Sequence, residues 1–252
     1  MPSQESLIQI KGTTGNMTFS KTADGYRAQK KSNGLSAEKI KNSSTCERIR
    51  ENGAEFGRAG RAGRLLRQTF RALALKASDR RMVPRMTQQM TRVVKSDPTN
   101  ARGMRNAVDG EIGLLQGFQF NINCNLTEIF FAPITATVDR TSGQTEIEVL
   151  PFVPAEMVKM PVGTTHFKLK SGAAAIDFTA EECSSSSKSS DFIKWNNTAT
   201  AVITLANSVP PNTVHPIFIL FGIEFYQEVN GLFYPLQSTA FNALGIIKVD
   251  SQ

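Results

Sequence analysis

The spacing of the apolar residues changes at Gly117, and this change limits the folds that are open to the chain. Before it, apolar residues recur every three or four positions, as they do on one face of a helix. After it, Phe118 and Phe120 begin an alternation of apolar and polar residues that is typical of a half-buried strand. We therefore expect an α+β chain, with a basic N-terminal β-hairpin plus helices over 1–116, followed by an antiparallel β-sandwich over 117–252.

The second half contains many short strand patterns with turn signals between them. Thr141-Ser142-Gly143-Gln144 joins two such patterns, and Asn230-Gly231 joins the last long pair as a hairpin turn. The run 183–190, CSSSSKSS, has low complexity and is expected to be an exposed, mobile loop. About nine short strands fit an immunoglobulin-like or a jelly-roll sandwich, and both topologies stay open. The expected strands are 118–126, 134–138, 145–149, 165–170, 173–178, 199–206, 216–228, 232–236 and 244–249.

The N-terminal half begins with a hairpin pattern over 7–31, in which Asp24-Gly25 is a favoured turn pair. Helical patterns follow over 35–76, 80–96 and about 99–116. The middle pattern places five apolar residues in one stripe, and we expect this stripe to lie in the core. These residues are Met82, Met86, Met90, Val93 and Val94.

Basic residues are concentrated in the first part of the chain. Residues 1–110 contain 22 Lys and Arg and 9 Asp and Glu, whereas residues 111–252 contain 7 and 13. The formal net charges are therefore +13 and −6, in agreement with +7 for the whole chain. This asymmetry permits binding to nucleic acid, and it equally permits contact between a basic and an acidic surface of two copies. We expect a homo-oligomer, with nucleic acid as an alternative partner.

The leading candidate for an interaction surface is the arginine series from Gly57 to Arg71. Because a helix turns about 100° per residue, arginines at steps of three or four wrap partly around one side of it. Each glycine in a helix interior lowers helix stability by about 1 kcal/mol relative to alanine. Glycines at this spacing are therefore expected where another backbone packs closely against the helix. The series predicts a protein contact or a polyanion site, and the plainer alternative is a solvated basic surface. The candidate residues are Gly57, Arg58, Gly60, Arg61, Gly63, Arg64, Arg67 and Arg71.

No pattern of catalytic or ligand-binding residues stands out. His166 and His215 have no neighbours that form a known nucleophile motif. Cys46, Cys124 and Cys183 lie far apart and lack metal-ligand spacing, so we expect neither a disulfide framework nor a metal site, and a single disulfide stays open. The glycines of the arginine series lack the GxxxxGK[ST] pattern of a phosphate loop. We therefore expect no enzymatic activity, no cofactor and no small-molecule substrate.

The beginning of the chain is polar and is followed by only four mostly apolar positions, which is unlike a secretory signal. No apolar run approaches the roughly 20 residues that a membrane helix needs. We expect synthesis in the cytoplasm without a signal peptide and no membrane span. The final location stays open, with an assembly or a particle among the alternatives.

Three segments carry a resemblance to a known group of proteins. They are GTTGNMTFSKTADGYRAQK at 12–30, RENGAEFGRAGRAGRLLR at 50–67 and EFYQEVNGLFYPLQSTAFNALGIIKV at 224–249. With them the chain resembles an uncharacterised family of Bacteroidota proteins that carries a domain of unknown function. The resemblance spans most of the chain and implies a bacterial or phage-related source. It implies no assigned activity and no site residues.

Taken together, these features favour a non-enzymatic structural protein that assembles with copies of itself into a filament, ring or particle. Its basic N-terminal region would contact the acidic β domain of another copy. The alternative is a nucleic-acid-associated virion or packaging protein whose basic half faces the genome. Against this alternative, region 1–110 has few aromatic side chains for base stacking and no known nucleic-acid-binding motif. A carbohydrate-binding adhesin finds little support, since Trp195 is the only tryptophan.

Overall fold

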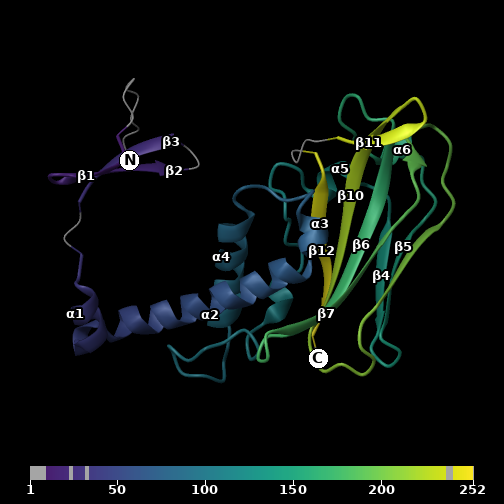
Figure 1. The fold of residues 1–252 in the computed structure, drawn as a ribbon. Helices are drawn as coiled ribbons and strands as arrows, with labels where there is room; N and C mark the ends of the chain where they lie inside the picture. Colours follow the sequence, from purple (N-terminus) through teal and green to yellow (C-terminus); the bar gives the residue numbers. More distant parts are fainter. Residues whose placement is uncertain (1–9, 23–24, 32–33, 237–240, 252) are drawn as a thin grey trace. The chain divides into compact units, whose positions relative to one another are not determined.

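The computed structural model describes residues 10–22, 25–31, 34–236 and 241–251 (Figure 1). Asp24 of the expected turn pair lies outside these ranges. The chain divides into two compact units, residues 1–50 and residues 51–252. All strand pairs within the described ranges are antiparallel, and helices precede most of the strands. The α+β class expected from the sequence is therefore confirmed.

The first unit contains a small antiparallel sheet of strand order β1-β2-β3. Phe19 pairs with Ala28 and Lys21 pairs with Tyr26, so these residues share one face with Met17. No residue of the three strands is buried. The elements of this unit are β1 (Gly12–Thr14), β2 (Met17–Thr22), β3 (Gly25–Lys30), α1 (Ala37–Asn42) and the 3₁₀ turn η1 (Ser44–Cys46).

Three helices, α2 (Glu47–Thr69), α3 (Arg71–Ala74) and α4 (Met82–Lys95), supply the helix layer of the second unit from residue 51 onward. Helix α2 buries Ala62, Gly63, Leu65 and Leu66. All five residues of the methionine and valine stripe of α4 are buried, which confirms that this stripe lies in the core.

The third expected helix, at 99–116, is wrong, because only the 3₁₀ turn η2 (Ile112–Leu115) forms there. The carboxylate of Asp97 instead accepts hydrogen bonds from the backbone N–H groups of Thr99, Asn100 and Asn106. Side-chain acceptors of this kind compete with the helical pairing of the backbone. The segment therefore folds as a loop that is tied to the end of α4.

A large sheet lies at the centre of the second unit, with the long strands β6 (His166–Asp177) and β10 (Ile217–Val229) in its middle. Residues 217–226 of β10 are all buried, as expected for a strand that is covered on both faces. The strands on the two sides of this pair are β7 (Glu182–Ser189) and β8 (Ile193–Lys194) beside β6, and β11 (Leu232–Pro235) and β12 (Ala243–Asp250) beside β10.

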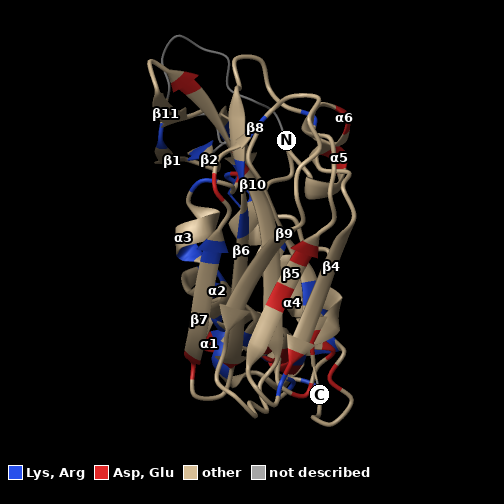
Figure 2. Cartoon of the chain, turned by 90° about the vertical axis from the view of Figure 1, so that its right-hand side faces the viewer, with Lys and Arg blue, Asp and Glu red and all other residues tan. Residues whose placement is uncertain are grey.

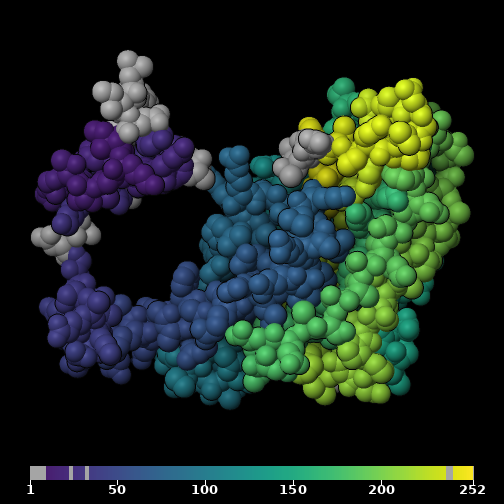
Figure 3. All heavy atoms as spheres, in the orientation of Figure 1, coloured from purple at the N-terminus to yellow at the C-terminus, as the bar shows by residue number. Residues whose placement is uncertain are grey.

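The two faces of the large sheet are covered by different layers. On one face, Phe218 and Leu220 share an apolar core with Leu66 of α2 and Met86 of α4. Figure 3 shows this helix layer, in blue, packed directly against the green and yellow sheet. Helices and sheet therefore share one core, and the change of pattern at Gly117 does not coincide with the division between the compact units.

On the other face, Ile219 and Phe221 share a second core with Ile147, Val149 and Leu205 of a small sheet. The small sheet has the order β4-β5-β9, with β4 (Ile134–Asp139), β5 (Gln144–Val149) and β9 (Ile203–Ser208). The second unit thus has three layers, which are helices, large sheet and small sheet (Figure 1).

Two expectations in the second half are wrong in detail. The serine run 183–190 is not a loop, because residues 182–189 form the outer strand β7, which pairs with residues 170–177 of β6. The expected strand 118–126 is reduced to one bridge between Gln119 and Gly245. Two short helices, α5 (Leu126–Ile129) and α6 (Pro154–Met157), form outside the expected helical segments.

Candidate functional site

The arginine series lies on α2 and α3, and its members have different environments. The guanidinium group of Arg58 is directed into the chain, where its Nη1 atom donates hydrogen bonds to the carbonyls of Gly103 (2.8 Å) and Arg105 (3.1 Å). Arg67 is half-buried, and its Nε atom donates to the carbonyl of Gly63 at 3.2 Å. Both side chains therefore stabilise the fold of their own chain.

The three glycines of the series also differ. A Cβ atom added to Gly63 would lie 3.4 Å from Cγ of Met86, so Gly63 lies where α2 and α4 approach each other. A Cβ atom added to Gly60 would have no neighbour within 4 Å, and at Gly57 it would meet only Arg61 of the same helix, at 4.0 Å. At Gly63 the expected close packing is present, and the element that approaches is α4 of the same chain. Gly57 and Gly60 lie on open surface of α2.

Arg61, Arg64 and Arg71 are exposed. The Nε atom of Arg61 lies 3.7 Å from Oε1 of Glu181, but both side chains are more than half exposed, so this pair contributes little to stability. Arg71 lines a shallow depression of about 270 Å³ together with Arg67. These side chains are therefore available to a partner.

Basic residues dominate the exterior of the helix layer. Residues 51–95 contain eleven Lys and Arg but only three Asp and Glu. Of these acids, Glu55 is buried and accepts a hydrogen bond from the N–H of Gly103, and Asp79 pairs with Arg85. We call the exposed basic residues of this layer the basic helix surface, which consists of Arg61, Arg64, Arg71, Lys76, Arg80, Arg81, Arg92 and Lys95.

The outer face of the small sheet has the opposite charge. In the register of this sheet, Glu148 lies between Thr135 and Thr204, and Glu146 lies between Thr137 and Ala206. None of its three strands contains Lys or Arg, and β5 carries red acidic positions in Figure 2. We call this face, with Asp139, Glu146 and Glu148, the acidic sheet face. It and the basic helix surface lie on opposite sides of the large sheet.

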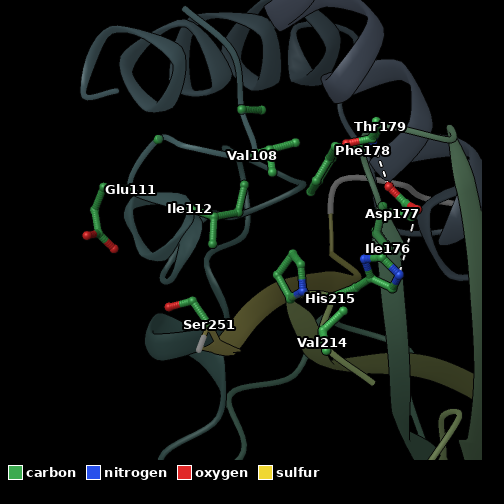
Figure 4. A pocket seen from close by; sticks show the side chains of 13 residues that line it. Val108, Glu111, Ile112, Ile176, Asp177, Phe178, Thr179, Val214, His215 and Ser251 are labelled. Carbon is green, nitrogen blue, oxygen red and sulfur yellow. Dashed lines mark hydrogen bonds and ion pairs between the residues drawn. The ribbon is translucent and has the colours of Figure 1, made fainter. Parts of the chain in front are cut away.

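A pocket of about 420 Å³ lies where the 107–112 segment, the end of β6, residues 214–216 and Ser251 meet (Figure 4). Ile112, Ile176 and Phe178 give it apolar walls, and Asp177 and His215 lie together on one side of it. Their atoms Oδ2 and Nε2 are 3.7 Å apart.

The carboxylate of Asp177 is held in its ionised form. Its Oδ1 atom accepts hydrogen bonds from the backbone N–H groups of Thr179 (2.7 Å) and Ala180 (3.0 Å). The N–H groups of Ala180 and Thr179, together with the nearby imidazole of His215, lower the pKa of Asp177 below its ordinary value, although burial opposes them. Sequence reasoning missed this pair because Asp177 and His215 are distant in the chain and neither belongs to a motif.

A second group of polar side chains surrounds the buried Glu224. Its carboxylate accepts from Nζ of Lys170 at 2.7 Å and from the hydroxyl of Tyr226 at 2.6 Å. Burial alone would raise the pKa of Glu224, but the bonds from Lys170 and Tyr226 outweigh it and lower the pKa. Nearby, the rings of Phe192 and Phe233 stack at 3.9 Å, a pair that the sequence did not reveal. Because its polar groups are paired with one another, this cluster stabilises the sheet.

Three further findings concern the described part of the chain. The thiols of Cys46, Cys124 and Cys183 are free. Within the described ranges, no group of three His, Cys, Asp or Glu residues could hold a metal ion. None of the helices in those ranges has the length and apolar character that a bilayer crossing requires.

Comparison with known proteins assigns no family to the chain. No protein-family model matches the chain, and no curated protein matches it. Among solved structures, the chain is similar to one described as "pH-induced modulation of Streptococcus parasanguinis adhesion by Fap1 fimbriae". The sequence identity is 14%, the TM-score is 0.21, and the match covers 46% of this chain and 80% of that chain. A likeness of this size bears on neither the fold nor the function of this protein.

Proposed function

We propose that the chain is a non-enzymatic structural protein that assembles with copies of itself, with the basic helix surface of one copy against the acidic sheet face of the next. The observation that carries this proposal is the presence of two oppositely charged surfaces on opposite sides of one three-layer unit. A contact between two different faces is heterologous, and it repeats as a ring if the rotation closes or as a filament if it does not.

The individual contacts in such an interface are weak. An ion pair between exposed side chains contributes about 0.2–1 kcal/mol, and salt screens it. Arg61, Arg64 and Arg71 are exposed on one side of the unit, and Glu146 and Glu148 lie on the other. Several such pairs must act together, so the assembly is expected to weaken as the salt concentration rises.

The first unit supports the same proposal by an independent observation. Met17, Phe19, Tyr26 and Ala28 give its small sheet an apolar face, and none of these residues is buried. A small sheet needs an apolar face packed against another element for independent stability. The body of the same chain or a second copy would supply the surface that covers this face.

The finer description of the fold is also a proposal. The core shared by the small and large sheets supports a β-sandwich, and an immunoglobulin-like or jelly-roll topology would be two ways to connect it. In either topology, the helix layer on the other face of the large sheet would be an additional layer.

Light scattering and negative-stain microscopy of the purified chain test the assembly. At low salt we expect particles much larger than a monomer, and we expect them to dissociate at about 0.5 M salt, where screening is strong. The variant Arg61→Glu/Arg64→Glu/Arg71→Glu is expected to stay monomeric at low salt. A monodisperse monomer of the unmodified chain at high concentration and low salt would contradict the proposal.

A matched control tests whether assembly depends on the position of the charge change or only on the net charge of the chain. Lys159, Lys188 and Lys194 are exposed and lie outside the helix layer. The variant Lys159→Glu/Lys188→Glu/Lys194→Glu changes the net charge by the same amount, and it is expected to assemble like the unmodified chain. Equal loss of assembly in both triple variants would mean that net charge alone matters.

The second candidate function is association with nucleic acid, which the large excess of basic residues in the helix layer favours. In that case a fluorescent DNA duplex would bind at about 50 mM salt, and the affinity would fall steeply as salt rises. The Arg61, Arg64 and Arg71 triple variant would lose this binding. DNA binding by a chain that stays monomeric would favour this candidate over self-assembly.

A further inference from the structure

The pocket beside Asp177 and His215 contains hydrogen-bond acceptors that accept no hydrogen bond, and the proposed assembly does not involve them. Oδ1 of Asp177 is engaged by two backbone N–H groups, whereas Oδ2 faces His215 at 3.7 Å, which is too long for a hydrogen bond. Among the described residues, no hydrogen bond to either ring nitrogen of His215 is present. Apart from this 3.7 Å contact with each other, Oδ2 of Asp177 and Nε2 of His215 have no hydrogen-bond partner among the described residues, and both residues line the pocket.

The distance between these two atoms defines the group that fits them. A nitrogen that donates hydrogen bonds lies about 2.7–3.2 Å from each acceptor, so one nitrogen can reach two acceptors that are 3.7 Å apart. A neutral imidazole accepts one hydrogen bond, and an ionised carboxylate accepts only. An ammonium group has three N–H donors and a positive charge, and it would satisfy both acceptors at once.

The rest of the pocket fits an apolar body attached to that group. Its walls include Ile112, Ile176, Phe178 and Pro216. Glu111 also lines the pocket, and none of the lining residues is Lys or Arg. Val108 and Val214 line the pocket and are more than half exposed, so they offer apolar surface to an incoming molecule. Its volume of about 420 Å³ lies within the range of small-molecule sites.

We infer that this pocket binds a primary ammonium group that carries a small apolar body, with the nitrogen between Asp177 and His215 (Figure 4). The inference does not depend on the proposed assembly, because neither the basic helix surface nor the acidic sheet face includes these residues. The same chemistry belongs to a free amine and to a lysine side chain of a second copy.

The two histidines provide the readout. The chain contains only His166 and His215, and His166 is buried against Phe233 outside the pocket. The full chain is titrated with phenethylammonium chloride at about pH 8, where an imidazole is ordinarily neutral, while NMR follows the two imidazole signals. We expect a saturable shift of the His215 signal and an unchanged His166 signal. No saturable shift of His215 would overturn the inference.

Two controls make the test specific. 2-Phenylethanol has the same apolar body without the charge, and it is expected to bind at least about tenfold more weakly. Asp177→Asn keeps an oxygen for the two N–H groups but removes the charge, and it is expected to weaken amine binding by a similar factor. Asp191→Asn changes an exposed aspartate that does not line the pocket and belongs to neither charged surface, and it is expected to leave binding unchanged. Equal binding of amine and alcohol, or equal binding by the two variants, would overturn the inference.

A last arm identifies the source of the ammonium group. Light scattering of the unmodified chain is repeated at a saturating amine concentration. A fall in particle mass would assign the pocket to a lysine of a second copy, and an unchanged mass would assign it to a free amine.

Discussion

Asp97 shows how one side chain decides the path of a whole segment. Its carboxylate accepts four hydrogen bonds, from the backbone N–H groups of Thr99, Asn100 and Asn106 and from the side-chain amide of Asn100. Burial works to raise the pKa of Asp97, but the bonds from Asn100, Asn106 and Thr99 outweigh it and hold the pKa at about 2. The ionised carboxylate is therefore part of the fold.

This pKa predicts how stability depends on pH. The folded value of about 2 lies below the value of about 3.9 for an unfolded aspartate, so the contribution is present above pH 4 and is lost as the pH falls toward 2. Urea denaturation from pH 2.5 to 6 should find Asp97→Asn less stable than the unmodified chain near pH 6. The difference should shrink as the pH falls, whereas a constant difference would contradict this account.

Gly60 of α2 and Gly110 of the loop after α4 should respond to substitution in opposite ways. Gly60→Ala is expected to raise the free energy of unfolding by about 0.5–1 kcal/mol, because the added Cβ meets no neighbour and alanine favours a helix. Gly110→Ala is expected to lower it, because the added Cβ would clash with the carbonyl oxygen of Val93. Urea denaturation measures both effects. Destabilisation by Gly60→Ala would show that Gly60 has a packing partner within the chain.

At the scale of single elements, the arginine series separates into a structural part and an outward part. Arg58→Ala should destabilise the chain by about 1.5–3 kcal/mol, because it removes charge-assisted hydrogen bonds to the carbonyls of Gly103 and Arg105. Arg64→Ala, at an exposed position of the same helix, should change the free energy of unfolding by less than about 0.5 kcal/mol. Thermal and urea unfolding of the two variants test this, and equal effects would contradict it.

Elements whose apolar period matches a single buried face could be predicted from the sequence. Helix α4 follows its stripe from Met82 to Val94, and strands β4 and β5 lie close to their expected positions. These elements are fixed by local periodicity, which a reader of the sequence can see.

Other elements depend on partners that are distant in the chain. Residues 118–126 alternate like a strand, but Asp79 accepts the N–H of Ile122, and Arg85 donates to the carbonyls of Gln119 and Phe120. The serine run forms β7 because β6 is long enough to pair with it. Neither interaction leaves a signal in the local sequence, so the expected strand and the expected loop were wrong.

At the scale of the whole molecule, composition predicted the charge asymmetry but not its geometry. The sequence placed basic residues before acidic ones, whereas their location on opposite sides of one three-layer unit follows from how the helices and the small sheet cover the large sheet. The pocket at Asp177 and His215 needed the structure as well, because β6 and the segment before β10 bring these residues together.

The central claim is that these two surfaces recognise each other between copies. Two variants test it together: Arg61→Glu/Arg64→Glu/Arg71→Glu makes the part of the helix surface at positions 61, 64 and 71 acidic, and Glu146→Lys/Glu148→Lys makes the sheet face basic. Each variant alone would present like charges to its own copies, whereas an equimolar mixture restores opposite charges at every contact.

Sedimentation velocity at low salt is the most direct measurement. The account predicts that each variant alone sediments as a monomer and that the mixture sediments as a larger assembly, as the unmodified chain does. A mixture that sediments like its separate components, or a single variant that assembles like the unmodified chain, would contradict it.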